Sequence, residues 1–246
     1  KRCTFNCVYC QVDRRAPSPP REVDLGVLAR ELDGMLAAAA SGALPAEPEF
    51  ASLPPRLKAV RDVAFSGDGE PTASSVFPQA VELADRAVRA AALDLPLVLI
   101  TNATLLDRPA VRAAVDRLHA RRGQVWAKLD AGTPEYFRMI ERTSVAFDRV
   151  VGNIRQTASR HGVVIQSCFV RLQGRPPADA EIAAWCDRLG EILAAGRIEL
   201  VQVYTIARRP AEEFVAPLSP AEVDAIVATA RRRHPRLSVA PFYGPP

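Results

Sequence analysis

The sequence lacks any long apolar run. No stretch approaches the roughly 18 uninterrupted apolar residues that a membrane span needs, and no signal-peptide pattern is visible. Lysine is scarce as well: Lys1, Lys58 and Lys128 are the only three, and every other basic residue is arginine. We therefore expect a cytoplasmic protein with no membrane partner. The arginine excess fits a GC-rich coding bias, and the net charge of +4 permits a nucleic-acid partner without demanding one.

The composition is that of an ordinary globular protein. The chain has 246 residues, of which 48% are hydrophobic and 24% charged, which argues against a disordered or collagen-like chain. We expect one domain over 1–246, because this length suits a single barrel-type unit. Residues 41–58 are rich in proline, glycine and alanine, and we interpret them as an irregular insertion within that domain.

Strand and helix patterns alternate along the chain. We predict strands over 62–66, 95–100, 124–129, 163–170, 198–204 and 237–240, and helices over 24–40, 76–92, 109–121, 146–161, 179–195 and 219–233, with a short helix after Thr133. This order predicts an α/β fold, with parallel strands inside and helices outside. Ligands of such folds gather at the carboxyl ends of the strands.

The cysteines form one cluster and two isolated residues. Cys3, Cys7 and Cys10 lie within eight residues, whereas Cys168 and Cys186 are isolated and suit small buried positions. Without a secretory signal, a disulfide framework is a poor explanation for the cluster. Three thiolates on one loop can hold three irons of a cubane cluster and leave the fourth open. A structural zinc site is the alternative, but it needs four ligands and no second pair is present.

Several motifs together resemble the radical S-adenosylmethionine (radical SAM) superfamily. Its signature is similar to the Cys-x3-Cys-x2-Cys spacing seen here, with Tyr9 before the last cysteine. The glycine-rich segment 65–72, the strand end at Asn102 and the segment 128–132 resemble later motifs of the same superfamily. The combination is most similar to the branch of wyosine-type tRNA-modifying enzymes and their bacterial relatives.

The resemblance implies a fold and a chemistry. The fold would be a partial (β/α)6 radical SAM barrel whose first strand is missing from this chain, leaving the cysteine loop poorly anchored. The cofactors would be a [4Fe–4S] cluster on Cys3, Cys7 and Cys10 and S-adenosylmethionine on the fourth iron. Reductive cleavage would give a 5′-deoxyadenosyl radical that abstracts hydrogen from the substrate, an iron–sulfur oxidoreductase chemistry. An external donor such as flavodoxin or ferredoxin would supply the electron.

The resemblance also implies which residues bind S-adenosylmethionine. They are Tyr9, Gly67, Asp68, Gly69, Glu70, Asn102 and Lys128. Alternatives stay open for most of them. The glycines could form an ordinary strand-to-helix turn, Tyr9 could shield the cluster, and Asn102 could be a turn residue alone. Glu70 either orders the glycine turn or is a solvated acid, and Lys128 either reaches the cofactor carboxylate or pairs with Asp130 or Glu70. Lys128 and Asp130 are also the catalytic candidates.

The substrate is the least determined part of the prediction. A tRNA base is the expectation, with Arg208, Arg209 and the run 231–236 as candidate phosphate contacts. The further cysteines or flavodoxin domain of the wyosine enzymes do not occur in this sequence. A peptide- or protein-modifying or activating radical SAM enzyme is one alternative. A non-catalytic iron–sulfur or zinc-binding protein is another, from a different class.

Overall fold

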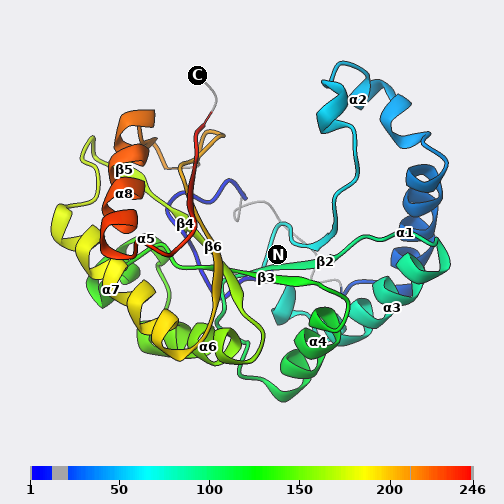
Figure 1. Cartoon of the computed structure of the whole chain (residues 1–246), viewed down its shortest axis with the longest axis horizontal. Coiled ribbons are helices and arrows are strands. Elements are labelled where there is room, and N and C mark those ends of the chain that lie inside the picture. The colour runs from blue at the N-terminus through cyan, green and yellow to red at the C-terminus, as the bar shows by residue number, and fades with distance from the viewer. Residues whose placement is uncertain (1, 13–21, 211, 245–246) are drawn as a thin grey trace.

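A parallel β-sheet forms the centre of the fold (Figure 1). The computed structural model describes residues 2–12, 22–210 and 212–244. Within them, six strands lie in the order β1-β2-β3-β4-β6-β8, each parallel to its neighbours. Their bounds are β1 (Val63–Phe65), β2 (Leu97–Thr101), β3 (Gln124–Lys128), β4 (Val163–Cys168), β6 (Ile198–Tyr204) and β8 (Val239–Phe242). Because spatial order follows chain order, the sheet is a partial barrel and the predicted α/β class is confirmed.

The longer helices lie along the outer side of the curved sheet (Figure 1). They are α1 (Leu25–Ala40), α3 (Phe77–Ala90), α4 (Pro109–His119), α5 (Pro134–Glu141), α6 (Phe147–Arg160), α7 (Asp179–Ala195) and α8 (Pro220–Arg233). Helix α1 begins after Asp24, whose carboxylate accepts hydrogen bonds from two backbone N–H groups. Ser219 and Glu222 form the capping box of α8. None of the described helices combines the length and apolar character needed to cross a membrane.

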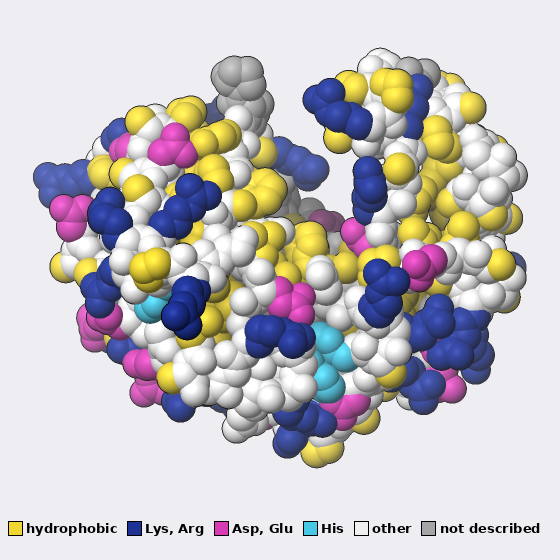
Figure 2. All heavy atoms as spheres, viewed as in Figure 1, with side chains coloured by type: hydrophobic (Ala, Val, Ile, Leu, Met, Phe, Trp, Pro, Cys, Tyr) yellow, Lys and Arg dark blue, Asp and Glu magenta, His cyan; other side chains and the backbone are white. Residues whose placement is uncertain are grey.

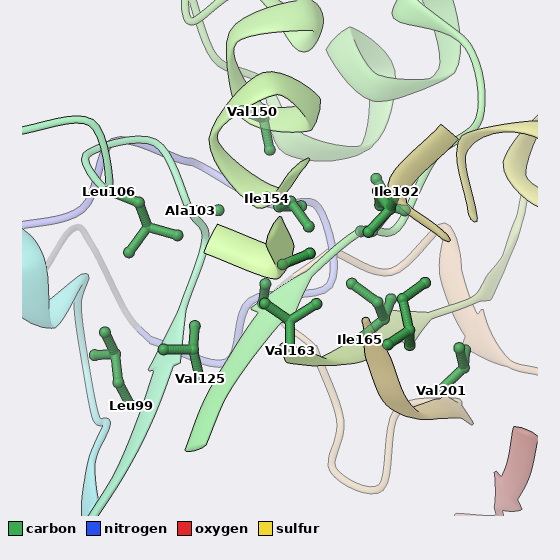
Figure 3. Packing of buried hydrophobic residues seen from close by; sticks show 14 of the residues in the cluster. Leu99, Ala103, Leu106, Val125, Val150, Ile154, Val163, Ile165, Ile192 and Val201 are labelled. Atoms are coloured by element: carbon green, nitrogen blue, oxygen red, sulfur yellow. The ribbon is translucent and has the colours of Figure 1, made fainter. Parts of the chain in front are cut away.

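The hydrophobic core lies between the sheet and these helices. In β3, Val125 and Ala127 are fully buried, whereas Trp126 and Lys128 are partly exposed. Successive residues of a strand face opposite sides, so Val125 and Ala127 face the helices and Trp126 and Lys128 face the concave side. Figure 3 shows the packed side, where apolar side chains meet at Leu99, Ala103, Leu106, Val125, Val150, Ile154, Val163, Ile165, Ile192 and Val201.

A second, antiparallel pair of strands was not predicted from the sequence. The pair consists of β5 (Val170–Leu172) and β7 (Val215–Pro217). The single strand expected over 163–170 is therefore wrong at its end, because β4 ends at Cys168 and Val170 already belongs to β5. The N–H of Phe169 still donates to the carbonyl of Tyr204, and the chain then joins the smaller sheet. Neither β5 nor β7 is long enough to show a periodic pattern of its own.

The insertion over 41–58 consists of short helical turns that project away from the sheet (Figure 1). They are η1 (Leu44–Ala46), α2 (Pro48–Ala51) and η2 (Pro55–Leu57). Each has a proline among its first two residues, where the missing N–H costs no helical hydrogen bond. The prolines therefore mark where these turns begin.

His119, at the end of α4, is a partly buried imidazole. Its Nε2 atom has no hydrogen-bond partner among the described residues. Its ring stacks on that of His161 with centroids 4.3 Å apart, and Nε2 of His161 contacts a carboxylate oxygen of Asp116 at 2.6 Å. Burial, together with the neighbouring His161, lowers the pKa of His119 from 6.5 to about 4. The folded chain therefore keeps this ring neutral where the unfolded chain protonates it.

We expect the free energy of unfolding to fall as the pH is lowered from 6.5 towards 4, because the unfolded chain binds the extra proton in that window. Above pH 6.5 the ring is neutral in both the folded and the unfolded chain, so its titration no longer lowers the free energy of unfolding. The expected loss is about 1–2 kcal/mol, since the ring is partly exposed and solvent screens part of the effect. Urea unfolding of the native chain and of His119→Phe across this range measures it. The variant keeps a stacking ring that cannot titrate, so an equal pH slope in both proteins would contradict the prediction.

Candidate active site at the carboxyl edge of the sheet

The cysteine segment lies against the carboxyl ends of the first two strands. The carbonyl of Arg2 accepts a hydrogen bond from the N–H of Glu70 at 2.8 Å, just after the glycine turn that follows β1. The side-chain amide of Asn102, which follows β2, donates to Thr4 Oγ1 at 2.8 Å and lies 3.7 Å from Cys3 Sγ. The structure therefore brings together three motifs that are far apart in the sequence.

The other side of the cysteine segment rests on the end of α5. The N–H groups of Asn6 and Val8 donate to the carbonyls of Glu141 and Ile140 at 2.8 and 2.9 Å. Phe5, which directly precedes Asn6, is only 3% exposed and packs in the main core. The expectation of a poorly anchored loop is therefore wrong for this structure. The last turn of a helix has carbonyls without intrahelical partners, and here they bind the segment.

The two glycines of the turn are required for different reasons. Gly67 has a φ of +135°, a backbone conformation that side chains disfavour. A Cβ on Gly69 would lie 2.5 Å from the carbonyl oxygen of Arg2, so this glycine makes room for the cysteine segment itself. Asp68, between them, is exposed. That Gly67, Asp68 and Gly69 contact S-adenosylmethionine stays a prediction.

Glu70 is a buried carboxylate that orders the turn. It is 5% exposed and accepts hydrogen bonds from the hydroxyls of Thr72 (2.5 Å) and Thr101 (2.7 Å) and from the N–H of Asn102 (2.8 Å). Burial raises the pKa of Glu70, while these hydrogen bonds favour the ionised form. The alternative of a solvated acid is wrong. By joining the turn after β1 to the end of β2, Glu70 fixes the position of Asn102.

Lys128 pairs with Asp130, one of the alternatives left open by the sequence. Its Nζ lies 3.1 Å from Asp130 Oδ2, donates to the hydroxyl of Tyr204 at 2.8 Å, and lies 5.1 Å from the ring centroid of Tyr9. Burial would lower the pKa of Lys128, but the Asp130 carboxylate, together with the neighbouring Tyr204, Cys168 and Glu141, holds that pKa well above the ordinary value. Lys128 is therefore a fixed cation at this edge. That Lys128 also contacts the carboxylate of S-adenosylmethionine stays a prediction.

Glu141 is a site residue that sequence reasoning missed. The Tyr9 hydroxyl hydrogen-bonds to the Asp130 carboxylate and lies 3.3 Å from Glu141 Oε1. Burial, followed by the negative charge of Asp130, raises the pKa of Glu141 well above its ordinary value. Burial and Glu141 in turn raise the pKa of the Cys7 thiol. No sequence signal marks this residue, because a glutamate in the last turn of a helix is ordinarily a solvated side chain.

The donor set fits an iron–sulfur cluster by its chemistry and position. Cys3, Cys7 and Cys10 are free, partly exposed thiols on one short segment, and thiolates are the usual ligands of such clusters. In the described part of the chain, no three His, Cys, Asp or Glu side chains converge into a metal site. Cluster binding therefore requires the thiols to turn towards one another. Cys168 and Cys186, by contrast, are buried as expected.

Comparisons with known proteins agree with this architecture. No protein-family model matches the chain, and no curated protein matches it. A structure of TYW1 with a lysine-pyruvate adduct bound has a TM-score of 0.62 at 14% identity, covering 94% of this chain and 70% of that chain. A radical SAM methyltransferase from Sphaerobacter thermophilus has a TM-score of 0.63 at 13% identity, covering 98% and 63%. Native anSMEcpe with bound AdoMet has a TM-score of 0.54 at 15% identity, covering 96% and 60%. The chain therefore has the fold of radical SAM enzymes, the superfamily that its sequence motifs resemble.

Proposed function

We propose that the chain is a radical SAM enzyme whose three clustered cysteines hold a [4Fe–4S] cluster and whose neighbouring turn binds S-adenosylmethionine. One observation carries the proposal: the cysteine segment is hydrogen-bonded to the glycine turn through Arg2 and Glu70, and to the end of β2 through Asn102. In a parallel sheet this edge is where ligands bind. A cysteine motif that served only as a structural metal site would not need these contacts.

The residues of this edge have separable roles in the proposed chemistry. Bound together, the reduced cluster and S-adenosylmethionine supply the hydrogen-atom abstraction. Glu70 and Asn102 hold the cysteine segment against the sheet, and the turn at Gly67 presents backbone groups to the polar end of the cofactor. Lys128, kept charged by Asp130, supplies a cation for a carboxylate at the same edge.

A tRNA base is the proposed substrate. The sequence resemblance to the wyosine-type branch supports this choice, as does the likeness of the fold to TYW1. Arg208 and Arg209 follow β6 and line a cavity of about 450 Å³. Nη1 of Arg208 donates to Oε1 of Gln11, next to the cysteine motif, at 3.3 Å. The run 231–236 precedes β8 and so lies at the opposite edge of the sheet, where Arg231 donates to the carbonyl of Val239. We therefore keep Arg208 and Arg209 as the proposed phosphate contacts.

The proposed setting is the cytoplasm, with flavodoxin or ferredoxin as the external electron donor. The exposed cysteine edge supports a partner that delivers electrons from outside, since the segment carrying Cys3, Cys7 and Cys10 is partly exposed. An enzyme that modifies peptides would need the same donor, so this partner does not distinguish the two substrate classes.

The test is anaerobic reconstitution with iron and sulfide, followed by addition of dithionite and S-adenosylmethionine. We expect about four irons per chain and formation of 5′-deoxyadenosine. Unfractionated tRNA should raise the rate of 5′-deoxyadenosine formation, whereas an unrelated RNA of equal length should not. Zinc in place of iron would refute the enzyme proposal. Iron without cleavage would support a non-catalytic iron–sulfur protein, and stimulation by peptides alone would refute the tRNA substrate.

A further inference from the structure

A row of polar side chains crosses the concave face of the sheet. Lys128 of β3, Gln166 of β4 and Gln202 of β6 are register partners on neighbouring strands, and all three are partly exposed. The next residue of β4, Ser167, is fully buried and accepts a hydrogen bond from Trp185 of α7 on the helix side. Because successive strand residues face opposite sides, Gln166 points to the concave face.

The two amides of this row are only partly satisfied. Gln166 Nε2 donates to Gln202 Oε1 at 2.8 Å, and within the described part of the chain neither amide has another hydrogen-bond partner. The side-chain amide oxygen of Gln166 and the remaining side-chain N–H groups of both glutamines are thus available to a ligand. Parallel sheets ordinarily cover both faces with apolar side chains. A polar row on this face therefore indicates a recognition surface.

An apolar wall lies beside the row. Trp126 precedes Lys128 by two residues on β3 and so shares its concave face. Trp126 is the register partner of Val164, which pairs with Leu200 on β6. The indole N–H donates to Gln124 Oε1 at 2.9 Å, which satisfies its polar atom within the strand. The partly exposed ring is then a flat apolar surface beside the amides.

The row also lies next to the proposed radical site. Lys128 contacts the ring of Tyr9, which directly precedes Cys10 in the cysteine motif. On the side that the long helices leave uncovered (Figure 1), the molecule is hollowed between the part carrying α2 and the C-terminal part (Figure 2). A ligand on this face is therefore open to solvent on one side and close to the cysteines on the other.

We infer that Gln166 and Gln202 recognise the hydrogen-bonding edge of a nucleobase, while Trp126 packs against its flat face. The inference rests on the proposed function and specifies how its substrate is held. Glutamine amides present a donor and an acceptor side by side, the pattern that bases carry on their edges. An aromatic ring beside them suits any base, because every base has a flat π-face. The amides thus provide selectivity, and the indole provides contact area.

Tryptophan fluorescence tests the inference on the full chain before any cluster is loaded. Of the two tryptophans, Trp185 is fully buried and Trp126 is partly exposed, so quenching by an added solute reports Trp126. The probes are adenosine, guanosine, cytidine and uridine at millimolar concentrations. We expect saturable quenching by at least one nucleoside and its loss in Trp126→Phe.

The glutamine variants supply the decisive comparison. Gln166→Leu with Gln202→Leu should weaken nucleoside binding about tenfold, because the base loses its paired hydrogen bonds. Gln156→Leu, at an exposed position of α6, is the matched control and should bind like the native chain. Gln166→Asn, which keeps an amide but shortens its reach, provides a second variant if the double leucine variant does not fold.

Other outcomes separate this inference from the proposed function. Equal nucleoside affinity in the double variant and in Gln156→Leu would overturn the inference, as would the absence of saturable quenching. Quenching by N-methylacetamide, a peptide mimic, but not by nucleosides would overturn it in favour of a peptide substrate. Cluster loading and cleavage of S-adenosylmethionine are measured separately, so nucleoside binding without them would refute the radical chemistry and leave the recognition surface standing.

Discussion

Replacing any one of Cys3, Cys7 or Cys10 with alanine should abolish uptake of a four-iron cluster. The three thiols are the only cysteines on the short segment that lies at the carboxyl edge of the sheet. Three thiolates bind three of the four irons, so the loss of one would leave two irons without a protein ligand. Iron and sulfide analysis after anaerobic reconstitution, with the visible absorption of the cluster, measures the effect.

Two internal controls distinguish loss of a ligand from loss of the fold. Cys168 and Cys186 are buried, and replacing either with alanine should leave the iron content unchanged. The far-ultraviolet circular dichroism of all five variants should match the native chain, since each replacement by alanine removes only one sulfur atom. A triple variant of the clustered cysteines that still binds about four irons would show that the cluster ligands have been assigned wrongly.

Gly69→Val should detach the cysteine segment from the glycine turn. Even a Cβ at this position would meet the carbonyl oxygen of Arg2 at 2.5 Å, and a branched side chain makes the overlap larger. The nearest atoms all belong to the backbone of Arg2, which cannot turn away as a flexible side chain can. Overpacking of this kind costs about 1–3 kcal/mol, and here displacement of the segment relieves it.

We therefore expect Gly69→Val to lose both cluster retention and S-adenosylmethionine binding, rather than S-adenosylmethionine binding alone. Limited proteolysis of the N-terminal segment, iron content and equilibrium binding of S-adenosylmethionine measure the three effects. Gly34→Ala on α1 is the matched control, because a Cβ there meets nothing within 4 Å. That control should leave all three readouts unchanged. A Gly69→Val chain with native iron content would refute the close approach seen in the structure.

The sequence alone determined most of the fold. The apolar run over 95–100 predicted one strand, and the helices predicted over 24–40 and 219–233 begin at the capping residues Asp24 and Ser219. These signals are local: periodicity and capping depend on residues within one or two turns of each other. The cysteine spacing and the glycine turn were visible for the same reason, since each motif lies within eight residues.

Only the tertiary structure decided which of these motifs meet, and how. Glu70 could be a solvated acid or an organising one until the fold placed two threonine hydroxyls and the N–H of Asn102 around it. Glu141 reaches Tyr9 across 132 residues, a contact that no local pattern encodes. The face presented by Gln166 became known only when β4 was placed between its neighbours and α7. Burial and pairing depend on residues distant in the chain, so strand alternation limits the possibilities and the packed sheet selects among them.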